Sequence, residues 1–274
     1  MAWISDTHDG SAGKFLDLLD ALLVAAFSTW SVYDSGFAAN EKVYRCYDPA
    51  SDPEIDFYLH VKDNQANYVE ILMYDSWDIA SHSYLLDTGC KVIWGQDAGY
   101  PPYIAKGASG YYFRSAEHDF VYIDKGEWEA NYVGSLLPFS SSWKAPFQMI
   151  VLFTSSTGYA AGYNPLAYYS NSAGSSVTKA LMGSGGFGGQ TVKPRAYQCS
   201  YLYFKTSDGK AAMNETCIFD ENSFLVLGKF NGIKYNYNRA DYVNDDFVTI
   251  GADTWRYVEG TAGSKFSCFI KQNV

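Results

Sequence analysis

The pattern that most constrains the fold is an alternation of apolar and polar residues after residue 54. Ile55, Phe57, Leu59 and Val61 alternate with more polar neighbours, and the segment 69–74 repeats this pattern. A period of two is typical of β-strands, because successive side chains of a strand point to opposite faces. Further strands are predicted at 42–47, 91–94, 111–114, 119–123, 148–153, 198–206, 224–230, 247–250, 255–258 and 267–271. The sequence therefore predicts a mainly β fold of antiparallel sheets, arranged as a β-sandwich or as barrel-like sheets.

One helix is expected ahead of the strands, over residues 14–27. Its apolar positions recur at helical spacing, and Ser11 lies where an N-cap would stand. The predicted apolar face consists of Leu16, Leu19, Leu22, Leu23 and Ala26, with Lys14 and Asp17 on the opposite face. We expect this helix to cover one face of a sheet.

Two Gly-containing pairs predict tight hairpin turns. Asp208-Gly209 and Asn231-Gly232 each lie between apolar runs, and both residue types tolerate the positive backbone angles of such turns.

The segment 164–194 differs from the rest in composition. Ser, Gly, Ala and Tyr dominate it without a sustained period, which indicates a surface loop or linker. It divides the chain into an N-terminal helix and β domain at 1–163 and a part at 195–274. That second part is a C-terminal β domain or a continuation of the same sheet system.

The chain is rich in aromatic and poor in charged residues. Its 274 residues include 24 Tyr and 7 Trp, and the charged fraction is 18%. Such rings are favoured at protein interfaces, but they are also common in strands, so composition leaves both interpretations open.

Charge and hydropathy exclude several classes of partner. Lys and Arg total 20 against 30 Asp and Glu, and no basic run exists that could neutralise phosphates, so no nucleic acid partner is expected. The apolar run 15–27 is too short to span a bilayer, so no membrane insertion is expected. Acidic residues precede it where a secretory signal would be basic, so we expect synthesis in the cytoplasm.

No motif predicts catalysis, a metal or a cofactor. Cys46, Cys90, Cys199, Cys217 and Cys268 form no C-x-x-C pair, and buried free thiols are expected. The four histidines are widely spaced. Glycines 183, 185 and 188 match G-x-G-x-x-G, but the strand and helix that a dinucleotide site requires are not predicted around them. The run 117–119 is interpreted as a surface turn. Carboxylate pairs such as 245–246 are scattered along the chain and predict no glycosidase site by themselves.

One aromatic block carries the most specific information. It comprises Tyr111-Tyr112-Phe113, Val121-Tyr122-Ile123 and the run 129–139, which reads E-A-N-Y-V-G-S-L-L-P-F, with Pro146 after it. This block resembles one in a widespread family of tailed-bacteriophage virion proteins. The N-terminal helix followed by Trp30, the Asp208-Gly209 turn, the Asn231-Gly232 pair and the closing Thr254-Trp255 strand are similar to that family's order of features.

The resemblance implies a structural, non-enzymatic component of the virion, in the tail, baseplate or neck. It implies partners that are other copies of the chain and other virion proteins. The expected assembly contacts are Tyr111, Tyr112, Phe113, Tyr132, Leu137, Phe139 and Phe187. The same block also fits a second interpretation, in which it is an ordinary strand that ends in a tight turn of a monomeric sandwich. The alternative function is a module that binds a host surface glycan or receptor through exposed Tyr and Trp, and a glycan-cleaving enzyme is a third alternative.

Overall fold

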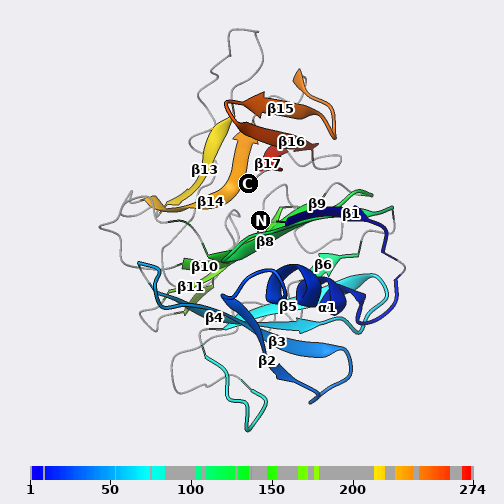
Figure 1. The fold of residues 1–274 in the computed structure, drawn as a ribbon, viewed down its shortest axis with the longest axis vertical. Helices are drawn as coiled ribbons and strands as arrows, with labels where there is room; N and C mark the ends of the chain where they lie inside the picture. Colours follow the sequence, from blue (N-terminus) through cyan, green and yellow to red (C-terminus); the bar gives the residue numbers. More distant parts are fainter. Residues whose placement is uncertain are drawn as a thin grey trace.

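The described part of the chain folds into three antiparallel sheets and one short helix, so the predicted mainly β class is confirmed (Figure 1). The computed structural model describes residues 2–8, 10–52, 54–74, 76–83, 103–106, 109–126, 129–135, 137, 147–153, 166–171, 176–178, 213–219, 226–236, 241–259 and 267–272. The predicted strands at 91–94 and 198–206 and the Asp208-Gly209 turn lie outside these residues.

The first sheet, here the N-terminal sheet, has five strands that follow one another in space as they do in sequence. They are β2 (Trp30–Ser35), β3 (Glu41–Asp48), β4 (Ile55–Lys62), β5 (Tyr68–Tyr74) and β6 (Tyr103–Ala105). Strands β4 and β5 carry the period-two pattern, and both predicted strands are confirmed. On β4 the residues Phe57, Leu59 and Val61 are all fully buried.

The second sheet, the central sheet, has seven strands in the order β1-β7-β8-β9-β10-β11-β12. Their bounds are β1 (Ala2–Asp6), β7 (Tyr111–Ser115), β8 (Asp119–Asp124), β9 (Glu129–Ser135), β10 (Phe147–Phe153), β11 (Leu166–Asn171) and β12 (Ser176–Thr178). Strands β11 and β12 fall within the segment 164–194, where a loop was expected. That prediction is wrong for these two strands, because β11 pairs with β10 and β12 pairs with β11, and this pairing compensates for the missing apolar period.

The third sheet, the C-terminal sheet, has the order β13-β14-β17-β16-β15. Its strands are β13 (Asn214–Phe219), β14 (Val226–Asn236), β15 (Phe247–Ile250), β16 (Asp253–Glu259) and β17 (Ser267–Lys271). A cluster of Tyr242, Trp255, Tyr257 and Phe269 forms its own small core. Among the described residues, the C-terminal strands thus form a separate sheet and do not extend the central one, apart from one bridge between Leu137 and Lys229.

The helix begins where the sequence predicts but changes its pitch. It comprises α1 (Lys14–Leu19) and a π-helical turn η1 (Asp20–Val24). The wider π turn shifts the later side chains, so Leu22 is half-buried and Ala26 is exposed, contrary to the predicted face.

The predicted N-cap at Ser11 is wrong. The N-cap residue is Gly13, which has a positive φ and no side chain that could cap the helix. Instead, the Phe15 backbone N–H donates a hydrogen bond of 2.8 Å to the carboxylate of Asp63, the residue that follows β4. A distant carboxylate does what a local hydroxyl was expected to do.

The main core lies between the N-terminal sheet and the central sheet, with the helix inserted between them (Figure 1). Phe15 of α1 contacts the rings of Phe120 and Tyr122 on β8. On the other side of the helix, the single proton of the Tyr44 hydroxyl is shared between two acceptors, the Leu16 carbonyl and the Asp20 carboxylate. The expectation that the helix covers a sheet is confirmed, and it covers two.

The opposite face of the central sheet meets the C-terminal sheet through Asn231 and Gly232. These residues were expected to form a hairpin turn, but they lie inside β14, and Gly232 has a φ of 62°. A Cβ at this glycine would lie 2.2 Å from the guanidinium of Arg114, so the position accepts no larger residue without a shift. The positive angle was predicted correctly, but it serves sheet docking and not chain reversal.

Two described cysteines, Cys46 and Cys268, are buried free thiols, as expected. Among the described residues, no helix combines the length and the apolar character that crossing a bilayer requires.

Candidate functional site

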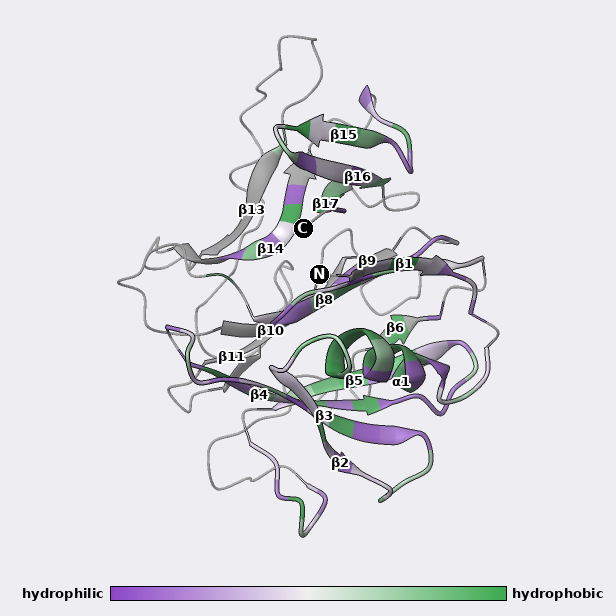
Figure 2. Ribbon diagram, viewed as in Figure 1, coloured by the Kyte–Doolittle hydropathy of each residue, from purple (hydrophilic) through white to green (hydrophobic). Residues whose placement is uncertain are grey.

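Three of the exposed large apolar side chains of the described chain lie on β15 or just before it, at the outer edge of the C-terminal sheet. The exposed fractions are 70% for Val243, 57% for Phe247 and 50% for Ile250. We call this group the β15 edge. Figure 2 shows hydrophobic colouring on β15, at the end of the sheet farthest from the helix. Large apolar side chains grouped at a surface mark interaction sites more often than singly scattered ones do.

The backbone of β15 is also available for pairing. Among the described strands, β15 pairs with β16 alone, in unbroken register from Phe247 to Ile250. It carries no charged residue and no bulge. The edge strand β2 of the N-terminal sheet differs, because its register shifts between Val32 and Asp34. Bulges and charges are the usual means by which edge strands avoid pairing with other chains, and β15 lacks both.

Hydrogen bonds hold the β15 edge in place from behind. The Asp246 carboxylate accepts a hydrogen bond from the Val243 backbone N–H at 2.8 Å. The Arg256 guanidinium lies 4.6 Å from the centre of the Phe247 ring and donates to the Asp245 carboxylate at 2.9 Å. The apolar side chains are therefore presented on a fixed backbone, with carboxylates beside them.

The aromatic residues expected to make assembly contacts lie elsewhere. Tyr111, Tyr112, Phe113 and Tyr132 are buried inside the chain. Tyr111 and Phe113 face the helix side of the central sheet, whereas Tyr112 and Tyr132 contact the C-terminal sheet. The chain's own layers therefore cover these four side chains on both faces of the central sheet, and their expected role as assembly contacts stays a prediction.

Of the remaining expected contact residues, the structure describes Leu137 but not Phe139 or Phe187. Leu137 is half-buried and pairs with Lys229 of β14, so it too contributes to docking within the chain. Phe139 and Phe187 lie outside the described residues, as does the G-x-G-x-x-G match at 183–188.

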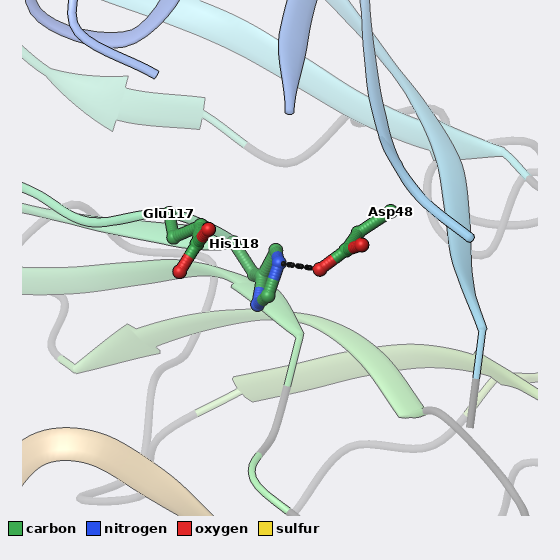
Figure 3. Close-up of side chains that lie close together, drawn as sticks. All are labelled: Asp48, Glu117 and His118. Atoms are coloured by element: carbon green, nitrogen blue, oxygen red, sulfur yellow. Dashed lines mark hydrogen bonds and ion pairs between the residues drawn. The ribbon is translucent and has the colours of Figure 1, made fainter. Parts of the chain in front are cut away.

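A group of possible metal ligands forms where the N-terminal and central sheets meet (Figure 3). Asp48 ends β3, and Glu117 and His118 form the turn between β7 and β8. One ligand atom from each residue lies within 4.8 Å of the other two. The His118 Nε2 atom is 2.8 Å from the Asp48 carboxylate. Sequence reasoning missed this group because Asp48 lies 70 residues from His118 in the chain.

The neighbouring Asp119 does not belong to this group. Its carboxylate is buried and forms an ion pair with Arg114, and it also accepts a hydrogen bond from the Asn231 amide at 2.9 Å. Burial raises its pKa, and the charge of Arg114 opposes this rise. Glu117 and His118 lie in a turn, as the sequence predicted, while Asp119 points into the junction with the C-terminal sheet.

A small pocket lies between the helix and the central sheet. It has a volume of about 280 Å³ and an apolar floor that includes Ile4 and Leu18. The lining also holds Asp6, Lys14 and Asp17. Because both signs of charge are present, the lining favours no single class of ligand.

Comparison with protein-family models and with curated proteins finds no match to the chain.

Proposed function

We propose that this chain is a structural, non-enzymatic component of a tailed-bacteriophage virion, made in the host cytoplasm and assembled through the β15 edge. Its partners would be other copies of the chain and other virion proteins in the tail, baseplate or neck. The phage assignment is supported by the similarity of the aromatic block at 111–139 to that family of virion proteins.

The β15 edge is the observation that supports an assembly role. Phe247 and Ile250 are exposed on a strand whose outer backbone groups have no partner strand among the described residues. A second strand laid along β15 would satisfy these groups, and it would flank Phe247 on one face of the sheet and Ile250 on the other. The net charge of -10 keeps free chains apart until such a partner is present.

The buried aromatic block has a different part in this proposal. Its rings fill the interior on both faces of the central sheet, so they make the chain a rigid three-layer block. Rigid presentation lowers the entropy lost when an edge strand docks. The assembly contact therefore moves from the block to the β15 edge.

A mass-spectrometric census of purified particles tests the virion role directly. We expect peptides of this chain in mature particles, at a constant ratio to the other structural proteins. Absence from washed, infectious particles would reject the role.

Charge substitutions test whether β15 is the contact. We expect the variant carrying Phe247→Lys and Ile250→Lys to fold normally but to be lost from particles. Ile79→Lys is the matched control, because Ile79 is 51% exposed but lies outside the C-terminal sheet. Incorporation of the double variant at the level of the control would show that another surface makes the contact, even if the chain is a virion protein.

A host-glycan-binding module is the second candidate, and one exposed ring favours it. Tyr47 is 38% exposed, and the Arg45 guanidinium lies 4.3 Å from the centre of its ring. Arg45 also donates two hydrogen bonds to Asp56, so a ring, a cation and a carboxylate adjoin at one surface point. Rings of this kind stack on sugars. Saturable binding of the purified chain to host cells, lost in Tyr47→Ala, would favour this function over assembly.

A further inference from the structure

The turn between β7 and β8 is fixed by contacts from other strands. The Thr29 hydroxyl donates to the Glu117 carbonyl oxygen at 2.5 Å, and the Ser135 backbone N–H donates to the His118 carbonyl oxygen at 3.0 Å. Gly134 makes the second contact possible, because a Cβ there would lie 2.4 Å from that same oxygen. The backbone that carries Glu117 and His118 is thus positioned from two sides before any ligand binds.

The three side chains already lie near the spacing that one ion needs. A zinc ion holds nitrogen and oxygen ligands at about 2.0–2.2 Å, which places neighbouring ligand atoms roughly 3–4 Å apart. Here the three ligand atoms lie within 4.8 Å of one another, and His118 Nε2 is 2.8 Å from an Asp48 oxygen. Asp48 and His118 are mostly buried, whereas Glu117 is exposed and can rotate.

Two of the three side chains are carboxylates that the fold brings together, since one oxygen of Asp48 and one of Glu117 lie within 4.8 Å of each other and of a His118 ring nitrogen. Among the described residues, the Glu117 carboxylate has no hydrogen bond or ion pair of its own. A divalent cation would neutralise charge that the fold itself brings together.

We propose that Asp48, Glu117 and His118 bind one divalent ion of the zinc class, with water completing its coordination. An imidazole nitrogen beside two carboxylates suits zinc and similar transition metals. Calcium takes six to eight oxygen ligands, and magnesium demands a near-ideal octahedron, so both fit this set poorly. Because Asp48 belongs to the N-terminal sheet and the other two lie in the turn between two strands of the central sheet, the ion links two layers of the molecule. This site is independent of the proposed virion role.

Zinc titration of the chelator-stripped chain tests the site. The competition assay uses zinc chloride against a chromophoric chelator, with magnesium and calcium chloride in parallel. We expect one zinc ion per chain at this site and no comparable binding of magnesium or calcium. The variants Asp48→Asn, Glu117→Gln and His118→Gln should each weaken zinc binding by at least about tenfold.

The matched control is His82→Gln. His82 Nδ1 also lies 2.8 Å from a carboxylate, that of Asp34, but no third ligand joins this pair among the described residues. It should bind zinc as the wild type does. Cobalt substituted for zinc gives a second measurement, since its visible absorption reports the ligand set and should change in each of the three site variants.

Glu117→Gln is the decisive variant, because an exposed side chain without a partner can be replaced without unfolding the chain. Loss of zinc affinity in this variant, with unchanged circular dichroism, supports the site. Wild-type affinity in Glu117→Gln or His118→Gln would overturn it, since zinc would then be held elsewhere. Failure of the wild type to bind zinc would overturn it as well.

Discussion

The two faces of the central sheet are joined to their neighbours by different kinds of contact. On the helix side, Phe113 and Phe120 stack with ring centres 5.2 Å apart inside a continuous apolar core. On the other side, the Arg114–Asp119 ion pair meets Asn231, and the Tyr112 hydroxyl donates to Asp245 at 2.8 Å. Adjacent residues of one strand, β7, therefore serve an apolar interface and a polar one.

The two kinds of contact have different consequences, one for the stability of the chain and the other for the orientation of its layers. Apolar burial is strong but has no direction, so it favours contact between the N-terminal layers without fixing one geometry by itself. Buried ion pairs and hydrogen bonds add little net stability, yet they penalise every arrangement that leaves a partner unsatisfied. We infer that the helix-side core supplies most of the stability and that the polar face sets how the C-terminal sheet is placed. The position of the β15 edge then depends on the polar face.

Truncation on the apolar face should have the largest effect. Phe120→Ala removes a fully buried ring that contacts Phe15 and Phe113, and we expect a loss of about 4 kcal/mol in the free energy of unfolding. Urea denaturation measures it, with Phe120→Leu as the milder control. A loss below about 1 kcal/mol would mean that this face is not the main source of stability.

Breaking the ion pair on the polar face should lower the free energy of unfolding somewhat less than Phe120→Ala does. It should also loosen the placement of the C-terminal sheet. Arg114→Met leaves Asp119 buried without its cation, and we expect a loss of about 3 kcal/mol. Hydrogen exchange should show faster exchange in β14 and β16, with little change in β4.

The double variant carrying Arg114→Met and Asp119→Leu is the control for this prediction. Because it removes both charges, most of the stability should return. If the double variant stays as unstable as the single one, the cost lies in packing around Arg114 and not in the unpaired charge.

Much of the sheet structure could be predicted from the sequence, because it depends on local pattern. The strands β15 and β17 have the predicted bounds, and the alternation at 55–61 and 69–74 marks β4 and β5 correctly. Strand β2 was missed, since a bulge between Val32 and Asp34 breaks its period. Short strands such as β6 carry too few residues to show a period at all.

The candidate sites could not be predicted, because they depend on tertiary contacts. An aromatic residue such as Phe113 has the same sequence signature whether its own chain or another one covers it. Asp48 reaches His118 only when two sheets pack together. The turn angle of Gly232 was recognisable, but its partner Arg114 lies more than a hundred residues away.

The tyrosines at 111 and 112 offer a matched test of the two faces at neutral pH. Tyr112→Phe removes a hydrogen bond to Asp245 and should cost about 1 kcal/mol. Tyr111 faces the core and its hydroxyl bonds to no described residue, so Tyr111→Phe should stay within about 0.5 kcal/mol of the wild type. Equal losses in the two variants, measured by urea denaturation, would remove the contrast between the faces.

Alkaline pH should produce the smallest effect and should act on both faces. Burial raises the pKa of Tyr111 and of Tyr112 above the usual 10.0, with further contributions from the charge of Asp6 and from the hydrogen bond to Asp245. The unfolded chain releases these protons first, so the stabilising contribution is complete below pH 10 and is lost as the pH rises from 10 through the higher pKa of the folded chain. Urea midpoints between pH ~9 and ~11 should therefore fall more slowly in each Tyr→Phe variant than in the wild type. An unchanged slope in Tyr112→Phe alone would show that its hydroxyl ionises as freely in the folded chain as in the unfolded one, and that the polar face is open to water.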